Sequence, residues 1–544
     1  MRFQSSRRDF VQGSLAAALS TGFMRSSWAQ TSANTPLTVE AETAYGRVHG
    51  TEVRGIKSFK GIPYAASTAG KNRFMPPLKP AAWTGVRDAL DYGARAPQQQ
   101  PRPRGEADEQ GATPGQQESE DCLLLNVWTP ALADGGKRPV IMWCHGGGFN
   151  TGSGAAPVND GTNLGLRGDI VTVTTNHRLN VLGYSYLGEI GGKDFEQSAA
   201  LGVLDLVAAL EWIRDNIERF GGDPGNVTII GQSGGAQKVS TLLTMPSAKG
   251  LFHRAVVMSG SALQLLERDQ AARVTHELVA ELGLAKPTIA QLQEVPIDKL
   301  MSAYFATVAK LNSQRLGQGF RPAVDGTAIT QHPFHPAASR VSPDVPVIFS
   351  HTSGEATFRA DERLFTLDEA GMRKELTNRT GDKTDALVAL YRKLYPKAMP
   401  PDLYFLIASD HQYGGGAMKA AERRSVPGFA PAYLYYWTWE SPLEGGKYRA
   451  QHTVDIAFAF DNVKASRLTA GAPDAQALAD QVSEAFIAFF RTGDPNTPKS
   501  KLPAWPRYDA TNRPTMVFSS TPALRNDPIR EQRLAMWDAL GLAG

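Results

Sequence analysis

The chain has 544 residues, of which 42% are hydrophobic and 20% charged, and this composition excludes global disorder and supports a large buried core. Its 52 glycines and 35 prolines follow no collagen-like or low-complexity period. The formal net charge of +3 equals that of the first 29 residues alone. A product without them is neutral overall, so nothing electrostatic predicts a nucleic-acid partner.

The segment Met1–Ala29 has the pattern of an export signal. Ser6-Arg7-Arg8-Asp9-Phe10-Val11 resembles the twin-arginine signal, a mildly apolar stretch follows, and Ser27-Trp28-Ala29 offers small residues to a signal peptidase. The alternatives are an amphipathic helix or a membrane anchor, but the apolar run is too short and too interrupted to span a hydrocarbon core of about 30 Å. We therefore expect export to the periplasm or the medium, no stable membrane insertion, and one domain over residues 30–544.

The first part of the mature chain predicts strands and one long loop. Leu37–Arg54 reads as short alternating strands with tight turns. Pro97–Glu118 is polar and proline-rich, which is typical of a long loop. We place no domain boundary there, because the sequence before it is too short for an independent large domain. Cys122 and Cys144 lie beside apolar, strand-like runs, and we expect two buried free thiols.

Strands and helices alternate over the next hundred residues. Val140–Trp143, Ile170–Thr174 and Val227–Ile230 are short apolar runs rich in β-branched residues, which predict buried strands. Leu204–Phe220 has helical spacing and ends at two glycines. The alternation predicts a mostly parallel sheet with helices on both faces and the chemistry at the carboxyl ends of the strands.

The later part of the chain predicts a helical cap and two packing helices. Gln264–Ser342 is helix-rich and more polar, and we expect it to cap the sheet. Ala475–Phe490 is an amphipathic helix that ends at a Gly-Asp-Pro sequence, and a last helix carries Met536 and Trp537.

A G-x-S-x-G motif directly follows the strand that ends at Ile230. Ser233 stands at its centre, between Gly231 and Gly235, and a helix-compatible stretch follows. This is the strand–turn–helix context of a nucleophile elbow, in which the turn leaves no room for a Cβ two residues away. The helix N-terminus then favours negative charge that develops at the hydroxyl. We interpret Ser233 as a nucleophile, and a plain structural turn is the alternative.

A second glycine-rich segment, His145–Phe149, follows the strand that ends at Cys144. Consecutive glycines let backbone N–H groups turn toward a substrate without obstruction by side chains. The amides of Gly147, Gly148 and Gly234 are therefore candidates for an oxyanion hole, with a tight turn as the alternative.

Together these segments resemble the type-B carboxylesterases, the carboxylesterase/cholinesterase group of the α/β-hydrolase fold. Further matching segments, in the family's order, are Phe59–Ala65, Arg73–Pro77, Glu120–Leu123, Asn176–Leu179, Asn216–Pro224, Thr492–Asn496 and Trp505-Pro506. The resemblance covers nearly all of the mature chain. It implies an α/β-hydrolase with a central, mostly parallel sheet, helices on both faces and a helical cap. The implied function is a serine hydrolase that cleaves carboxylic esters through an acyl-enzyme intermediate.

A serine nucleophile needs a base, which in turn needs an orienting acid. His332 and His335 lie in one turn-like stretch, and His351 lies on the loop of the best acid candidate, too near it in sequence for a face-to-face pairing. The segment around His452, followed by Asp455, resembles the family's H-x-x-D/E segment around its catalytic histidine. We expect His452 to be the base.

The acid is expected on the loop after the strand Val345–Phe349. Glu355 is the carboxylate there, and it aligns with the acidic member of the family's triad. Asp361 is the fallback, and Asp455 is interpreted as a support for the loop around His452.

Two departures from the family pattern carry expectations of their own. Gln232 stands where the family usually has a glutamate, so cation-directed choline-ester chemistry is not expected, and the alternative is that Gln232 only hydrogen-bonds a neighbouring loop. Gly234 replaces the usual alanine. The family's cysteine partner for Cys122 is also missing, since Ala94 and Ala96 occupy its neighbourhood, so we expect the loop that begins at Pro97 to be untied at its start.

No cluster of residues has metal-ligand spacing, so neither a metal nor an organic cofactor is expected. The expected partner is a small-molecule ester, and the oligomeric state stays open. The alternatives are amide or carbamate hydrolysis by the same machinery, and a catalytically inactive adhesion relative. The sequence leaves the acyl and alcohol preference open and places its determinants in Gln264–Ser342 and Pro97–Glu118.

Overall fold

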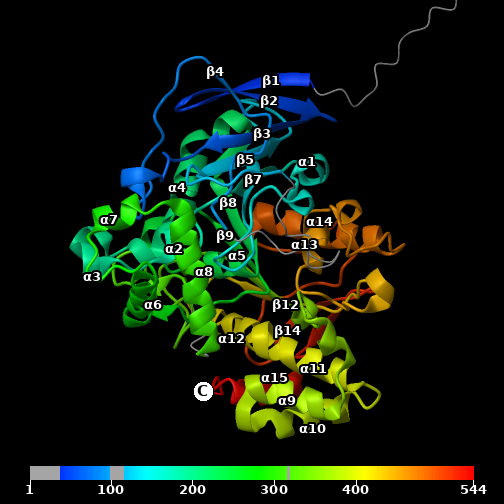
Figure 1. Ribbon diagram of the computed structural model, residues 1–544. Helices are drawn as coiled ribbons and strands as arrows, with labels where there is room; N and C mark the ends of the chain where they lie inside the picture. The colour runs from blue at the N-terminus through cyan, green and yellow to red at the C-terminus, as the bar shows by residue number, and fades with distance from the viewer. Residues whose placement is uncertain (1–36, 99–114, 315–318, 544) are drawn as a thin grey trace, which may run out of the picture. The chain divides into compact units, whose positions relative to one another are not determined.

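The computed structural model describes residues 37–98, 115–314 and 319–543 (Figure 1). The proposed signal Met1–Ala29 lies outside these residues and stays a prediction. The chain from Pro36 onward groups into one compact unit. Among the described helices, none combines the length and the apolar character needed to cross a membrane.

The described residues contain one sheet of 13 strands, in the order β1-β2-β3-β5-β7-β6-β8-β9-β12-β13-β14-β15, with β4 beside β2. The antiparallel end consists of β1 (Leu37–Thr43), β2 (Gly46–Val53), β3 (Ile56–Pro63) and β5 (Leu124–Thr129), and β4 is Val86–Asp88. The parallel strands are β7 (Val171–Thr175), β6 (Arg138–Cys144), β8 (Gly222–Gln232), β9 (Arg254–Met258), β12 (Val347–Thr352), β13 (Ala432–Trp437) and β14 (Pro514–Phe518). Antiparallel β15 (Ala523–Asn526) ends the sheet.

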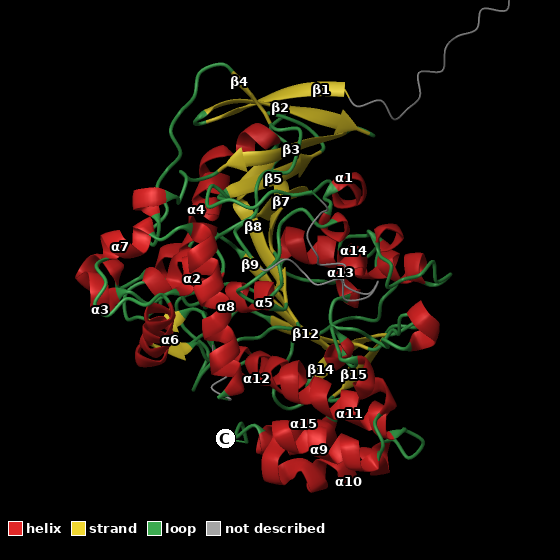
Figure 2. Cartoon of the chain, in the orientation of Figure 1, coloured by secondary structure: helices red, strands yellow, loops and turns green. Residues whose placement is uncertain are grey.

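Helices cover both faces of the parallel strands (Figure 2). One face carries α2 (Asn180–Tyr184), α4 (Leu201–Asn216) and α5 (Gly234–Leu242), and the other carries α1 (Thr162–Gly168), α13 (Val454–Ala459) and α14 (Ala475–Thr492). Alternate residues of β6 explain this layering. Val140 and Met142 join the core that contains α4, whereas Ile141 and Trp143 join the core that contains α14.

The helical cap is larger than predicted. The expected segment Gln264–Ser342 contains α6 (Arg268–Glu281), α7 (Ile289–Glu294) and α8 (Ile297–Ser313), with α3 (Gly188–Gly191) nearby. No helix was predicted between β12 and β13, yet four α-helices lie there: α9 (Glu369–Thr380), α10 (Thr384–Leu394), α11 (Pro400–Ser409) and α12 (Gly415–Arg424).

Helices α9, α10 and α11 pack around a core of their own, which includes Leu376, Val388, Leu403 and Met536, whereas Met418 of α12 joins the core that contains α4. Met536 comes from the C-terminal α15 (Arg530–Ala539), which lies among these helices at the bottom of Figure 1. The chain end therefore holds the group together.

A π-helical turn, Asp410–Gly414, joins α11 to α12. Such turns are frequent at functional sites because the extra residue re-aims the side chains around it. A Cβ on Gly414 would lie 2.9 Å from a carboxylate oxygen of Asp410 and 3.2 Å from Nδ1 of His351. The turn thus packs closely against β12 and needs glycine at its end.

The start of the long loop is tied, contrary to our expectation. Arg95 forms a 2.8 Å ion pair with Glu118, and the Arg95 side chain is only 3% exposed. The backbone N–H of Arg95 donates to Gln117, and its carbonyl accepts from Ser119, both at 2.9 Å. Buried polar contacts here close the loop without a cysteine bridge. Residues 99–114 of the loop lie outside the described residues.

Both cysteines are free and buried, as predicted. Cys144 ends β6 and Cys122 just precedes β5, and β7 lies between these two strands.

Candidate active site

Ser233 lies between β8 and α5 with φ 59° and ψ −125°. This region is strained for a non-glycine residue, and such strain persists only where the surrounding structure enforces it. A Cβ on Gly235 would collide with the carbonyl oxygen of Cys144, and one on Gly231 would collide with the backbone of Gly235. The two flanking glycines therefore allow the sharp turn that lifts Ser233 out of the sheet.

The loop after β6 supplies amide donors beside Ser233. Gly147 and Gly148 have φ values of 88° and 65°, and the Gly147 carbonyl accepts from the amide of Thr151 at 3.1 Å. A Cβ on Gly234 would collide with the backbone of Gly148, so the two segments are in direct contact. Within the described chain, the amides of Gly147, Gly148 and Gly234 have no assigned acceptor. These donors can together bind an anion.

His452 and Glu355 meet from segments far apart in the sequence. The Nδ1 atom of His452 hydrogen-bonds Oε2 of Glu355, and both side chains are almost fully buried. The other carboxylate oxygen accepts from the backbone N–H of Thr352 at 2.7 Å. A bridge between Gly354 and Gln451 joins the two loops. The carboxylate is therefore fixed, and the imidazole is fixed by it.

The second ring nitrogen of His452, Nε2, is available to accept a proton. With Nδ1 donating to Glu355, Nε2 is the nitrogen with a free lone pair. Nε2 is buried and has no hydrogen-bond partner among the described residues. This is the arrangement that a general base requires before a substrate arrives.

Two residues connect Ser233 with His452. The side-chain N–H of Gln232 donates to the backbone carbonyl of His452. The ring of Tyr413 stacks on the imidazole, with centroids 4.5 Å apart and planes 18° apart. Burial raises the pKa of Tyr413, and a hydrogen bond with the Ser233 hydroxyl opposes this rise. Tyr413 therefore packs on His452 and lies near Ser233.

The other candidates from the sequence lie elsewhere. His351 belongs to β12 and not to the loop after it, stacks on Tyr436 at 4.6 Å, and is buried so completely that its pKa falls to about 3. Asp361 is exposed and caps the turn before Arg363. Asp455 accepts from the Tyr435 hydroxyl at 2.7 Å. Of these carboxylates, only Glu355 contacts His452.

Two further buried carboxylates lie near Glu355. Burial raises the pKa of Asp410 and of Asp455 to about 7, and the charge of Glu355 contributes to both shifts. Asp410 accepts from the Tyr391 hydroxyl at 2.5 Å. Each of these two groups can hold a proton near neutral pH, which limits the negative charge around the Glu355–His452 pair.

A buried lysine supports the oxyanion loop from behind. Nζ of Lys238 donates to the carbonyl of His145 at 3.0 Å and lies 5.7 Å from the Phe149 ring. No carboxylate pairs with it among the described residues, and burial lowers its pKa to about 7. Burial, and then the charge of Lys238, lower the pKa of His145 and of His177, whose rings are stacked 4.4 Å apart.

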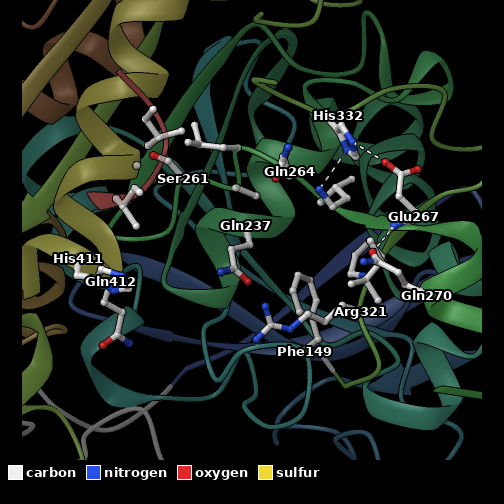
Figure 3. A pocket seen from close by; sticks show the side chains of 18 residues that line it. Phe149, Gln237, Ser261, Gln264, Glu267, Gln270, Arg321, His332, His411 and Gln412 are labelled. Carbon is white, nitrogen blue, oxygen red and sulfur yellow. Dashed lines mark hydrogen bonds and ion pairs between the residues drawn. The ribbon is translucent and has the colours of Figure 1, made fainter. Parts of the chain in front are cut away.

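A cavity of about 690 Å³ opens beside these groups (Figure 3). Phe149, which follows Gly148, and Gln412, which precedes Tyr413, both line it, as does Arg321. The cavity therefore begins next to the oxyanion loop. In the described chain, no group of three or more His, Cys, Asp or Glu side chains is arranged to hold a metal ion.

Sequence reasoning missed Tyr413 and Arg321. The run Gly414-Gly415-Gly416, which interrupts a helical pattern, was a signal that the backbone is irregular just after Tyr413. Arg321 lies in the segment to which the sequence analysis assigned specificity, but no local pattern distinguishes it from other exposed arginines.

The profile of the Carboxylesterase family matches residues 37–537. The chain is 31% identical over 512 residues to the para-nitrobenzyl esterase of Bacillus subtilis. This alignment covers 92% of this chain and 98% of that protein. It is 33% identical over 490 residues to the phenmedipham hydrolase of Pseudarthrobacter oxydans, covering 88% and 94%. The solved carboxylesterase EST55 of Geobacillus stearothermophilus superposes with a TM-score of 0.79 at 33% identity, covering 91% of this chain and 99% of that one.

Proposed function

The chain belongs to the carboxylesterase family and hydrolyses carboxylic esters, and we propose that Ser233, His452 and Glu355 perform the reaction as a catalytic triad. The predicted α/β-hydrolase fold is confirmed by its solved relatives. The observation that carries the proposal is the buried pairing of His452 with Glu355, which leaves Nε2 without a partner among the described residues, while Gln232, the residue before Ser233, bonds the His452 carbonyl.

Acylation starts when the Ser233 oxygen attacks the ester carbonyl and Nε2 of His452 accepts the hydroxyl proton. The carbonyl oxygen becomes an oxyanion, which the amides of Gly147, Gly148 and Gly234 stabilise. The carbon–oxygen bond to the alcohol then breaks, and His452 returns the proton to the departing alcohol. Glu355 stabilises the imidazolium that exists between these two transfers.

Deacylation repeats the sequence with water as the nucleophile. His452 takes a proton from the water as it attacks the acyl-enzyme, and the same amides bind the second oxyanion. Collapse releases the carboxylic acid, and the proton passes from His452 back to Ser233. The two halves balance with the ester and one water molecule as reactants, and the alcohol and the carboxylic acid as products.

The triad is tested with Ser233→Ala and Glu355→Gln, measured by 4-nitrophenyl ester turnover and by labelling with a fluorophosphonate probe. Loss of a triad member costs several orders of magnitude, so we expect Ser233→Ala to retain less than about 1% of the activity and to lose all labelling. The exposed Ser313→Ala on α8 is the matched control. Labelling that persists in Ser233→Ala would refute the assignment.

Export is a second part of the proposal. It is supported by Arg7-Arg8 and by the small residues at Ser27–Ala29. Expression of the full chain should give a periplasmic or secreted product that begins at Gln30, and lysines at positions 7 and 8 should retain the precursor in the cytoplasm. N-terminal sequencing of the fractionated protein decides this. An uncleaved product in the cytoplasm of a host with an intact twin-arginine system would contradict it.

A further inference from the structure

The cavity beside the oxyanion loop contains an arginine whose charge is not neutralised. Arg321 lies just before β11 (Ala323–Val324), which pairs in parallel with β10 (Leu266–Glu267). The amide of Leu266 donates to the carbonyl of Pro322 at 3.2 Å. This pairing fixes the backbone next to Arg321. Figure 3 shows its guanidinium beside Phe149, extending into the space between Phe149 and Gln237.

The cavity offers Arg321 no anion of its own. Glu267 is the one carboxylate among the described lining residues, and it pairs with His332 at 3.0 Å and caps α6. The structure gives Arg321 no ion pair with any described residue. The other nearby polar side chains, such as Gln237, Gln264 and Gln412, are neutral amides that can donate hydrogen bonds.

The guanidinium is also close to the reacting groups. Burial raises the pKa of Tyr413, whose ring stacks on His452, and the nearby charge of Arg321 opposes this rise. Gln237 lies one helical turn after Ser233 on α5, and Phe149 follows the oxyanion glycines. A substrate that occupies this cavity can therefore extend from Arg321 toward Ser233.

We propose that this enzyme selects esters that carry a free carboxylate, and that Arg321 binds this carboxylate while Ser233 attacks the ester group. The inference rests on the proposed triad and adds the substrate class. A guanidinium presents two parallel N–H groups to the two oxygens of a carboxylate, and such charge-assisted pairs are stronger than neutral hydrogen bonds. The lining amides can satisfy the outer lone pairs of the bound carboxylate.

The test compares two pairs of esters that differ in one charge. Mono-4-nitrophenyl adipate and its methyl ester place the carboxylate, or its neutral counterpart, on the acyl side. The second pair, 4-acetoxybenzoate and 4-acetoxybenzamide, places the carboxylate, or its neutral counterpart, on the alcohol side. We expect kcat/KM to favour the carboxylate by about ten-fold or more in one of the pairs. This preference should weaken between about 10 mM and about 500 mM salt, because the cavity is open to solvent.

Variants assign the preference to one side chain. Arg321→Met should bring the ratio of kcat/KM for the charged ester to kcat/KM for the neutral ester down to about one. Arg321→Lys should retain part of the preference for the charged ester. Arg87→Met on β4 changes the net charge equally, lies outside the cavity lining, and should leave the ratio and the turnover of neutral esters as in the wild type.

Two results would overturn the inference: equal kcat/KM for both members of both pairs, or a carboxylate preference that survives in Arg321→Met. Either result leaves the triad intact, provided that the neutral esters are hydrolysed and that Ser233→Ala abolishes their turnover. Failure of the triad itself would show differently, as turnover of neutral esters in Ser233→Ala.

Discussion

Gln232 holds His452 in place through the backbone of that residue. Its side chain is fully buried, and its N–H group donates to the carbonyl of His452. This contact favours the scaffold alternative over a direct role in sensing the alcohol group of the substrate. The amide that replaces the family's usual glutamate therefore positions the His452 loop.

We predict that Gln232→Glu lowers kcat/KM for neutral esters by about ten-fold. A carboxylate in place of the amide loses the donor and faces the His452 carbonyl with like partial charge, which costs about 1–3 kcal/mol. The ratio of butyrylcholine to a neutral isostere should stay unchanged. Steady-state kinetics with both substrates checks this, and a marked shift toward the cationic ester would return Gln232 to the substrate site.

The Ser233 hydroxyl is near enough to Tyr413 to oppose the rise in the pKa of that phenol, and a hydrogen bond between the two hydroxyls would have to break when the proton moves to Nε2 of His452. An interaction made only in the ground state slows the chemical step. We predict that Tyr413→Phe, which keeps the stacked ring, raises kcat by about two- to ten-fold, the equivalent of one neutral hydrogen bond. Single-turnover acylation rates measure this directly. A fall of more than ten-fold would mean that the phenol stabilises the transition state instead.

At the scale of elements, helix α5 buries a lysine side chain that has no carboxylate partner among the described residues. It carries Lys238 into the core behind the oxyanion loop, where burial lowers the lysine pKa from 10.5 to about 7. Between these two values the unfolded chain binds a proton that the folded chain does not. Stability from this group is therefore full above pH 10.5 and is lost as the pH falls to 7.

We predict that Lys238→Met is more stable than the wild type at pH 7, by about 3 kcal/mol, and that the difference shrinks toward pH 10. Urea unfolding at several pH values tests it, with the exposed Lys249→Met as control. Parallel stability curves for Lys238→Met and the wild type would contradict a neutral buried lysine.

Elements with a strong local pattern could be predicted from the sequence. The β-branched runs of β6, β7 and β8 and the glycine motif around Ser233 identify strands and nucleophile because their periodicity and steric demands are local. The helices α9 to α12 were missed. In α9, for example, only Met372, Leu376 and Thr380 are buried, so its apolar face is too narrow to be recognised.

Contacts between distant segments could not be predicted from residues alone. The pairing of Glu355 with His452 was expected only from the family resemblance, and the roles of Tyr413 and Arg321 depend on a π-helical turn and on a two-residue strand. The glycine run after Tyr413 signals an irregular backbone but not which residues Tyr413 meets, and a strand of two residues has no sequence signature. The extent of β12 was also misjudged, because His351 and Thr352 are polar residues that nevertheless continue a buried strand.

For the molecule as a whole, the Arg95–Glu118 pair closes the long loop against the sheet. We predict that Glu118→Gln lowers the free energy of unfolding by about 2–4 kcal/mol, because it leaves the buried Arg95 charge unpaired. Chemical denaturation measures the loss, and the double variant with Arg95→Met should recover part of it. A stability equal to that of the wild type would show that the backbone bridge alone closes the loop.

Closure of the loop by an ion pair also affects the redox conditions under which the protein can fold. Both cysteines are buried free thiols, and the loop is closed by the Arg95–Glu118 ion pair. No folding step among the described residues therefore consumes an oxidant. The described part of the chain can therefore reach its native state in a reducing or in an oxidising compartment. Its stability is thus uncoupled from the redox poise of its surroundings, and excess dithiothreitol should leave both activity and unfolding midpoint unchanged.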